Sequence, residues 1–184
     1  MPDWRKISMK RCILITDTRN DVAYELKNLN VLLVEDDPSM RFLLRDMLAA
    51  FGIEKTVTVP DGTKAFAELR QFPADIIITD WVMEPVDGLD FTRMVRSAPD
   101  SPNPFVPIIM LTSQGAYERV QKARDTGVTE YLIKPVTANA LYSRIVNVIQ
   151  NPRQFVRVSE YFGPDRRRTT QDFTGEERRD DETC

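Results

Sequence analysis

Chemically active side chains follow four short apolar runs in this chain. Each run is rich in β-branched residues and stops at a carboxylate, a hydroxyl or an amine. The runs cover residues 31–34, 76–79, 108–112 and 131–133, and the polar residues at their ends are Glu35, Asp36, Asp37, Asp80, Thr112 and Lys134. Carboxylates that lie close together cannot all stay ionised without a positive counter-charge. The consecutive acids at residues 35–37 therefore raise the question of whether a positive group or ion neutralises them or whether they are simply solvated.

The apolar runs predict a parallel β-sheet. With a fifth run at residues 56–59, they are nearly continuous and β-branched, as in strands buried on both faces. Amphipathic stretches separate the runs, so strand and helix alternate along the chain. Right-handed crossovers then place helices on both faces of the sheet. We expect an α/β, doubly wound, five-stranded parallel sheet with its site beyond the carboxyl ends of the strands.

Helical periodicity and helix-terminating residues define the stretches between the strands. The first helix has an apolar stripe at i, i+3, i+4 and i+7 and ends at Gly52. Asp61-Gly62 opens the second helix, which ends before Pro73. We expect the first helix at residues 40–51. The last three helices are expected at residues 89–96, 116–125 and 138–149.

Clustered carboxylates at a strand end fit magnesium chemistry. Oxygen ligands without nitrogen or sulfur select Mg²⁺ or Mn²⁺, and Mg²⁺ binds one or two carboxylates together with a phosphate oxygen. A carboxylate beside such an ion is a nucleophile toward phosphorus and forms an acyl phosphate. Lys134 would then supply fixed positive charge, and Thr112 a hydroxyl donor, for the phosphoryl oxygens.

Each of these residues alone has a simpler interpretation. A single Asp after a strand is commonly a turn residue or a helix N-cap, and Asp37 before Pro38 fits that role. A Lys-Pro pair commonly marks a loop. The functional interpretation depends on their joint position at the ends of successive strands.

The composition excludes several other kinds of chemistry. The chain has 184 residues, 42% of them hydrophobic, a net charge of −3 and no histidine. Zinc sites of the Cys/His kind, Ser-His or Cys-His nucleophiles and a phosphohistidine donor are therefore excluded. The mild net charge favours neither nucleic acid nor an anionic membrane as a partner, and no apolar run reaches the length of a membrane helix. The two cysteines, Cys12 and Cys184, form no motif, which favours a cytoplasmic setting.

The motifs at the strand ends resemble those of the response-regulator receiver domain, of the CheY type. The matching segments are VEDD, ITDWVMEPVDG, MLTS and YLIKP, all within residues 30–150. The resemblance implies the flavodoxin-like strand order 2-1-3-4-5 and bacterial two-component signalling. A histidine kinase or a histidine phosphotransfer protein would donate the phosphoryl group, with Mg²⁺ (or Mn²⁺) as cofactor. The chain would not be an enzyme with a separate substrate, because it would catalyse only its own phosphorylation and dephosphorylation.

The resemblance also implies which residues form the phosphorylation site. Asp80 would be the phosphoacceptor. Asp36 and Asp37 would hold the metal ion, together with Asp80 and the backbone carbonyl of Val82.

A second group of residues would respond to the phosphoryl group. Thr112 would be the switch hydroxyl, and Tyr131 the aromatic side chain that reorients with it. Lys134 would pair with the phosphoryl group, and the peptide bond to Pro135 would be cis.

Two features depart from the family's pattern. The family reads Met-Pro in the loop after the phosphoacceptor, whereas residues 83–85 read Met-Glu-Pro; the Asp-Gly pair at 87–88 keeps its place. Val82 and Gln114 occupy positions that control access of water to the phosphoryl group in the family. An apolar Val82 cannot hydrogen-bond an attacking water, so we expect slow self-dephosphorylation.

The resemblance divides the chain into three parts. Residues 1–29 form an N-terminal extension, in which CILITD suggests a further strand but a helix near residues 21–29 is favoured. Residues 30–150 form the receiver domain. Residues 151–184 are charged and poor in apolar side chains, so we expect a mobile tail. As an alternative to a fully mobile tail, its segment FVRVSEYF could dock on the domain or on a partner.

The output of the expected switch is open. We expect no second domain, which favours a regulator that acts by contact with an unknown downstream protein. A phosphate shuttle or sink in a phosphorelay and a phosphorylation-dependent dimer are alternatives. The arginines at 166–168 are the only support for a nucleic-acid partner, and neighbouring acids dilute their charge.

Two rival classes of protein fit the residues less well. A Mg²⁺-dependent Asp-nucleophile phosphatase needs an acid two residues after the nucleophile, but Asp80 is followed by Trp81 and Val82. A flavodoxin needs a hydroxyl-rich phosphate loop after the first strand, where this chain has acids that repel phosphate.

Overall fold

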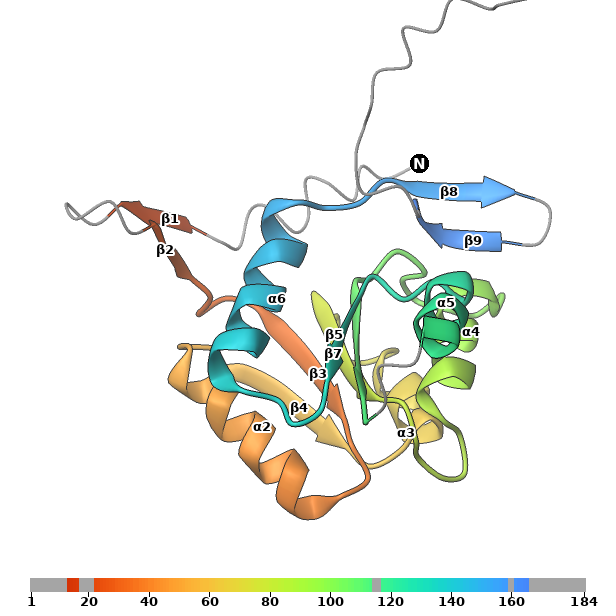
Figure 1. The fold of residues 1–184 in the computed structure, drawn as a ribbon, viewed down its shortest axis with the longest axis horizontal. Helices are drawn as coiled ribbons and strands as arrows, with labels where there is room; N and C mark the ends of the chain where they lie inside the picture. The colour runs from red at the N-terminus through yellow and green to blue at the C-terminus, as the bar shows by residue number, and fades with distance from the viewer. Residues whose placement is uncertain (1–12, 17–21, 114–116, 159–160, 166–184) are drawn as a thin grey trace, which may run out of the picture.

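The five expected strands form one parallel sheet. The structure is a computed structural model that describes residues 13–16, 22–113, 117–158 and 161–165. The strands pair in the order β4-β3-β5-β6-β7 (Figure 1). Their bounds are β3 (Asn30–Val34), β4 (Lys55–Val59), β5 (Ile76–Asp80), β6 (Ile108–Thr112) and β7 (Glu130–Ile133). Counted along the chain, these strands lie in the predicted order 2-1-3-4-5, which is therefore confirmed.

The expected helices are also present, with ends within two residues of the prediction where one was made. They are α2 (Pro38–Ala50), α3 (Gly62–Glu68), α4 (Gly88–Ser97), α5 (Tyr117–Thr126) and α6 (Ala138–Gln150). Four of them begin at a side-chain N-cap, which satisfies an otherwise free backbone N–H in the first turn. The capping residues are Asp37, Asp61, Asp87 and Thr137.

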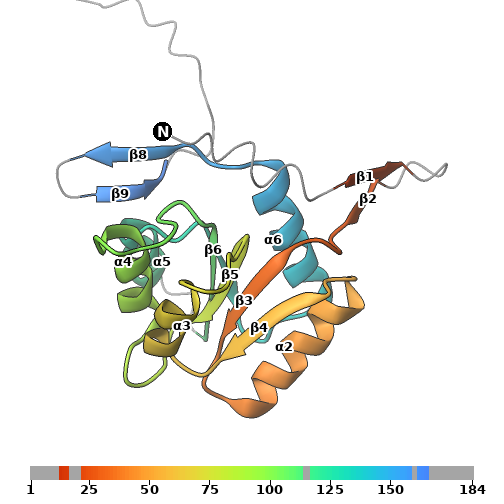
Figure 2. The same cartoon turned by 180° about the vertical axis from the view of Figure 1, so that it is seen from behind.

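The helices cover both faces of the sheet, as predicted. Figures 1 and 2 show α2 and α6 on one side, with α3, α4 and α5 on the other. Alternate side chains of β3 enter the two cores: Leu33 packs in the cluster with α2 and α6, and Leu32 packs in the cluster with α3 and α4. Because both faces of β3 are buried, its sequence is apolar throughout rather than alternating.

The N-terminal extension contains strands instead of the favoured helix. β1 (Ile13–Thr16) and β2 (Val22–Glu25) pair antiparallel in a separate two-stranded sheet. The prediction of a helix near residues 21–29 is therefore wrong. The alternative of a further strand is closer, although β1 pairs with β2 and not with the main sheet.

The C-terminal segment is structured where a mobile tail was expected. β8 (Phe155–Val158) and β9 (Tyr161–Pro164) form an antiparallel hairpin, and β9 packs against α4 and α5. The expectation of a mobile tail thus fails for these strands, and the alternative of a segment docked on the domain holds. Residues 166–184, which include the arginines at 166–168, lie outside the described residues.

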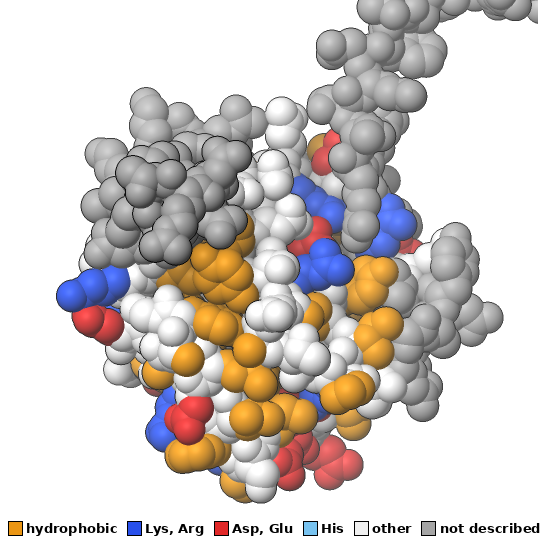
Figure 3. Space-filling model, turned by 60° about the vertical axis from the view of Figure 1, so that its left-hand side comes forward, with side chains coloured by type: hydrophobic (Ala, Val, Ile, Leu, Met, Phe, Trp, Pro, Cys, Tyr) orange, Lys and Arg blue, Asp and Glu red, His pale blue; other side chains and the backbone are white. Residues whose placement is uncertain are grey.

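The side of the molecule that carries α2 and α6 is rich in hydrophobic side chains, as Figure 3 shows. On α2, Phe42 is 58% exposed and Leu43 is 46% exposed. Among the described helices, none is both long enough and apolar enough to cross a membrane.

Candidate functional site

Three carboxylates meet at the carboxyl ends of the two central strands. Ligand oxygens of Glu35, Asp36 and Asp80 lie within 4.8 Å of one another. Glu35 follows β3 and Asp80 is the last residue of β5, and these strands are neighbours in the sheet. Glu35 is 1% and Asp80 8% exposed, whereas Asp36 faces solvent. The sheet therefore concentrates negative charge at one partly enclosed position.

Lys134, which directly follows β7, supplies positive charge to this cluster. Its Nζ lies 3.0 Å from Glu35 Oε2 and 3.0 Å from Asp80 Oδ1. The backbone N–H of Lys134 donates to the carbonyl of Thr112 over 2.7 Å, which ties the end of β7 to the end of β6. The Lys134-Pro135 peptide bond is cis, as predicted.

Burial and the neighbouring charges shift the pKa values of Glu35, Asp80 and Lys134. Burial raises the pKa of the Glu35 carboxyl, and the Asp80 carboxylate raises it further against the opposing Lys134 ammonium. Burial also raises the pKa of Asp80, although the hydrogen bond from Lys134 opposes this. Burial alone would lower the pKa of Lys134, but its bonds to Asp80 and Glu35 outweigh burial and raise it. The Lys134 ammonium thus only partly offsets the cost of burying the two carboxylates.

Asp37 lies outside this group of carboxylates. Its Oδ1 accepts a hydrogen bond of 2.6 Å from the backbone N–H of Met40, so the side chain caps α2. The structure places Glu35 with Asp36 and Asp80, where the sequence analysis had assigned Asp37. Pro38 directly after Asp37 was the signal for this, because proline favours the first helical position and the residue before it is then the N-cap.

The two proposed switch residues lie on the adjacent strands β6 and β7, two register positions apart. Thr112 ends β6 and is 2% exposed. Tyr131 in β7 is opposite Met110 in β6, and its side chain is half-buried. Val82, two residues beyond Asp80, is 58% exposed. Gln114 lies outside the described residues.

The loop after Asp80 folds back closely on that residue. The N–H of Gly88 donates to the carbonyl of Trp81 over 2.9 Å. A Cβ at Gly88 would lie 2.1 Å from the backbone carbonyl oxygen of Asp80, so only glycine fits there. The displaced proline, Pro85, follows a cis peptide bond from Glu84. The Asp-Gly pair thus has a steric reason to keep its position in this loop.

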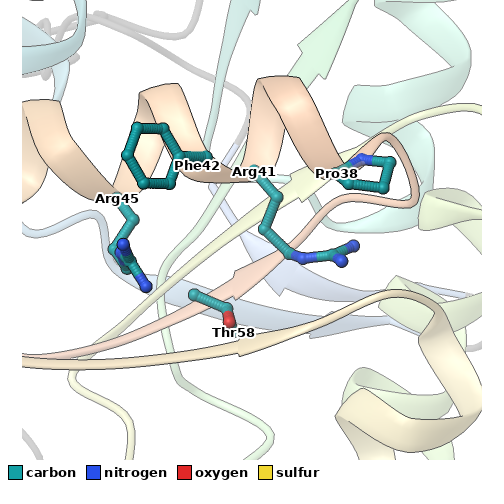
Figure 4. A pocket seen from close by; sticks show the side chains of 5 residues that line it. All are labelled: Pro38, Arg41, Phe42, Arg45 and Thr58. Atoms are coloured by element: carbon teal, nitrogen blue, oxygen red, sulfur yellow. The ribbon is translucent and has the colours of Figure 1, made fainter.

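Arg41 holds the loop that carries the acids. Its Nη1 donates to the carbonyl of Glu35 over 2.7 Å and to that of Asp36 over 3.4 Å. Figure 4 shows the pocket beside this loop, with Arg41 and Arg45 on the side of α2 that faces Thr58 of β4. No carboxylate lines this pocket, so it is separate from the acid cluster.

Comparison with known proteins identifies the class of protein that this fold and site define. The family model of the response regulator receiver domain matches residues 31–146. The chain belongs to this family. Its fold and family are those of CheY-like regulators of two-component signalling.

Several chemotaxis proteins are similar over the same region. CheY1 of Helicobacter pylori is 33% identical over 122 residues, which cover 66% of this chain and 97% of that protein. CheY of Pseudomonas aeruginosa is 30% identical over 122 residues, with the same coverage. CheY-3 of Vibrio cholerae is 29% identical over 124 residues, covering 67% of this chain and 94% of that protein.

Solved structures agree with these matches. The chemotaxis response regulator CheY4 of Vibrio cholerae superposes with a TM-score of 0.60 at 32% identity, over 65% of this chain and 98% of that one. A putative response regulator from Chloroflexus aurantiacus superposes with a TM-score of 0.61 at 26% identity, over 67% and 99% of the two chains. These proteins are matched almost completely, so the remaining third of this chain lies outside the shared fold.

Proposed function

We propose that Asp80 accepts a phosphoryl group from a histidine kinase or a histidine phosphotransfer protein in a Mg²⁺-dependent reaction. The observation that carries this proposal is the pairing of a nearly buried Asp80 carboxylate with Lys134 beside two further acids. A nucleophile, a fixed cation and a set of oxygen ligands thus occupy one position at the carboxyl edge of the sheet. Such partners, which act in the cytoplasm, are those of the receiver family.

The donor set fits a divalent cation. When ionised, the carboxylates of Glu35, Asp36 and Asp80 against the ammonium of Lys134 leave two negative charges, three minus one. All three donors offer hard oxygen atoms, as Mg²⁺ or Mn²⁺ requires. Glu35, Asp36 and Asp80, with the backbone carbonyl of Val82, are the groups that would hold the ion. When bound, Mg²⁺ would neutralise the charge that develops on the transferred phosphoryl group.

The chain's own residues would perform the transfer. An Asp80 oxygen forms a bond to phosphorus as the bond from phosphorus to the donor's histidine nitrogen breaks, so the product is an acyl phosphate and a free histidine. Lys134, already 3.0 Å from Asp80, would follow the negative charge onto the phosphoryl oxygens. Burial of Asp80 limits the access of bulk water to the reacting carboxylate.

The phosphoryl group would then change the surface of the domain. It adds about two negative charges and strong hydrogen-bond acceptors. Thr112, at the end of β6 beside β7, would turn toward it and leave space that Tyr131 fills. The face formed by α5, β7 and α6 would change shape as a result, and a downstream protein would bind that face. The same chemistry would also serve a phosphate shuttle or sink.

Intact mass spectrometry after incubation with Mg²⁺ and acetyl phosphate tests this proposal. We expect a gain of one phosphoryl group in the unmodified chain and none in Asp80→Asn, which keeps the shape of the side chain but removes the nucleophile. Asp90→Asn, an exposed acid on α4, is the matched control and should be phosphorylated normally. Absence of modification, or modification that persists in Asp80→Asn, contradicts the proposal.

A steady-state assay separates this function from that of a phosphatase. The chain would modify only itself, so small phosphate esters should not be turned over in Mg²⁺. Multiple turnovers per molecule that depend on Asp80 would assign the alternative, an Asp-nucleophile phosphatase.

A further inference from the structure

The β8–β9 hairpin is an addition to the receiver fold. The family model ends at residue 146, and the relatives are matched over nearly their full length without this segment. Figure 1 shows the hairpin at the end of the domain opposite the arrowheads of β3 and β4, and therefore far from the acid cluster. It nevertheless packs on α5, the helix that follows the switch residue Thr112.

Aromatic side chains attach the hairpin to the domain. Phe105, in the loop before β6, lies 5.3 Å from the ring centroid of Phe155 and 5.2 Å from that of Phe162. The guanidinium of Arg96, at the end of α4, lies 5.1 Å from the ring of Phe155. Edge-to-face rings and a cation over a ring are specific contacts. They hold both strands of the hairpin against the domain.

Two glycines bring the hairpin against the end of α5. Gly127 directly follows α5 with φ of +98°, and its carbonyl accepts a hydrogen bond of 3.0 Å from Arg96 Nε. A Cβ at Gly163 of β9 would lie 2.9 Å from the Cα of Gly127. A Cβ at Gly127 would lie 3.3 Å from the carbonyl oxygen of Phe162. The hairpin therefore fits one position of the α5 end and tolerates little displacement of it.

A second contact joins the segment before the hairpin to β7, the strand directly before Lys134 of the proposed phosphorylation site. Nη2 of Arg153, just before the hairpin, lies 2.8 Å from Oε1 of Glu130, whose side chain is 5% exposed. Glu130 is the first residue of β7, and Lys134 follows four residues later, about 13 Å along an extended strand. Tyr131 lies between them. One short strand thus joins the hairpin anchor, the switch aromatic and the lysine that pairs with Asp80.

We propose that the β8–β9 hairpin is an intramolecular clamp on the end of α5 whose docking is coupled to the state of Asp80. The inference rests on the proposed phosphorylation of Asp80. The observed docking fits the arrangement in which Lys134 pairs with Asp80 and Glu35. A phosphoryl group that displaces Thr112 and Lys134 moves α5 and β7, the two elements that the clamp contacts, and so weakens docking. Coupling is reciprocal, so a loosened clamp favours the phosphorylated arrangement.

The test uses the full chain with Mg²⁺ and beryllium trifluoride, a non-covalent stand-in for the phosphoryl group. Hydrogen exchange of residues 155–164 should become at least about fivefold faster in its presence, the lower end of typical coupling factors. Because the coupling is reciprocal, loosening the hairpin should raise the affinity for beryllium trifluoride by the same factor. Gly163→Ala, whose Cβ cannot fit against Gly127, should bind beryllium trifluoride at least about fivefold more tightly in calorimetry.

Matched variants control for general damage. Val158→Ala, at a side chain that is 61% exposed on β8, should leave both measurements unchanged. Phe105→Ala removes the aromatic contact from the domain side and should act like Gly163→Ala, which covers the case in which Gly163→Ala does not fold.

The outcomes separate this inference from the function on which it rests. If beryllium trifluoride does not bind the unmodified chain, the proposed phosphorylation fails and the clamp fails with it. If it binds while hairpin exchange stays constant, or while the variants bind it with unchanged affinity, the clamp is overturned and the phosphorylation proposal stands.

Discussion

Glu35 and Asp37 show how one helix start decides the chemistry of three consecutive acids. The backbone N–H of Met40 donates to the Asp37 carboxylate, so Asp37 is the N-cap of α2. Glu35, the least exposed of the three acids, forms an ion pair with Lys134 instead. Among the described acids, the carboxylates that lie together are therefore those of Glu35, Asp36 and Asp80, while Asp37 caps α2.

Substitution of the acids one at a time distinguishes a ligand from a cap. Asp36→Asn should weaken Mg²⁺ binding by about tenfold or more, because it removes a charged oxygen ligand. Asp37→Asn should change it less than about twofold, because asparagine caps helices as well as aspartate does. Titration with Mg²⁺ followed by calorimetry measures both. Equal losses in the two variants would restore Asp37 as a ligand.

Val82 carries a prediction about the lifetime of the phosphorylated state. Its side chain is exposed next to Asp80 but has no group that can hydrogen-bond water. We expect slow loss of the phosphoryl group, with a half-life much longer than seconds, and faster loss in Val82→Asn. The decay of the phosphorylated chain after removal of acetyl phosphate measures this. A half-life of seconds that Val82→Asn does not alter would refute it.

At the scale of elements, local sequence patterns predicted the strands and helices of the receiver domain well and the structure of the two terminal extensions poorly. The five strands and five helices have strong periodicity and side-chain caps, so their ends could be placed within about two residues, the usual uncertainty of helix bounds. The segment at 21–29 lacks such a pattern, and it forms β2 and a turn instead of a helix. Short extensions take their structure from tertiary contacts, which outweigh local propensity.

The hairpin is the clearest case of this effect. It lies in the C-terminal segment, residues 151–184, whose many charged residues indicate a solvated tail. Phe155 and Phe162 nonetheless pack on Phe105, about fifty residues earlier in the chain. Nothing in the segment itself reveals that partner, so docking could be offered only as an alternative.

At the scale of the whole molecule, the acid cluster sets how stability depends on pH. Glu35 and Asp80 have raised pKa values in the folded chain, so the folded state binds protons more tightly than the unfolded state. The free energy of unfolding contributed by these groups therefore falls as the pH rises from their unfolded pKa values, about 4, through the raised ones. A divalent cation that binds only the folded state would oppose this loss.

Thermal unfolding of the unmodified chain and Glu35→Gln tests this dependence. In the presence of a chelator, the melting temperature of Glu35→Gln should increase relative to that of the unmodified chain as the pH rises from about 4 to 8. Mg²⁺ should reduce the difference, since the unmodified chain retains the full ligand set. A difference that is constant with pH, or that Mg²⁺ enlarges, would contradict the raised pKa that burial and the neighbouring Asp80 carboxylate give Glu35.

The sequence by itself determined the parallel sheet, the helices on both its faces and the edge at which Asp80, Thr112 and Lys134 meet. These features follow from apolar periodicity and from the rule that parallel strands end at one edge, which are local or topological properties. The tertiary structure alone decided that Glu35 lies beside Asp80 and Lys134 and that the hairpin docks on α5. Both depend on which distant groups a side chain meets, and a carboxylate or a phenyl ring takes whichever partner the folded chain brings within reach.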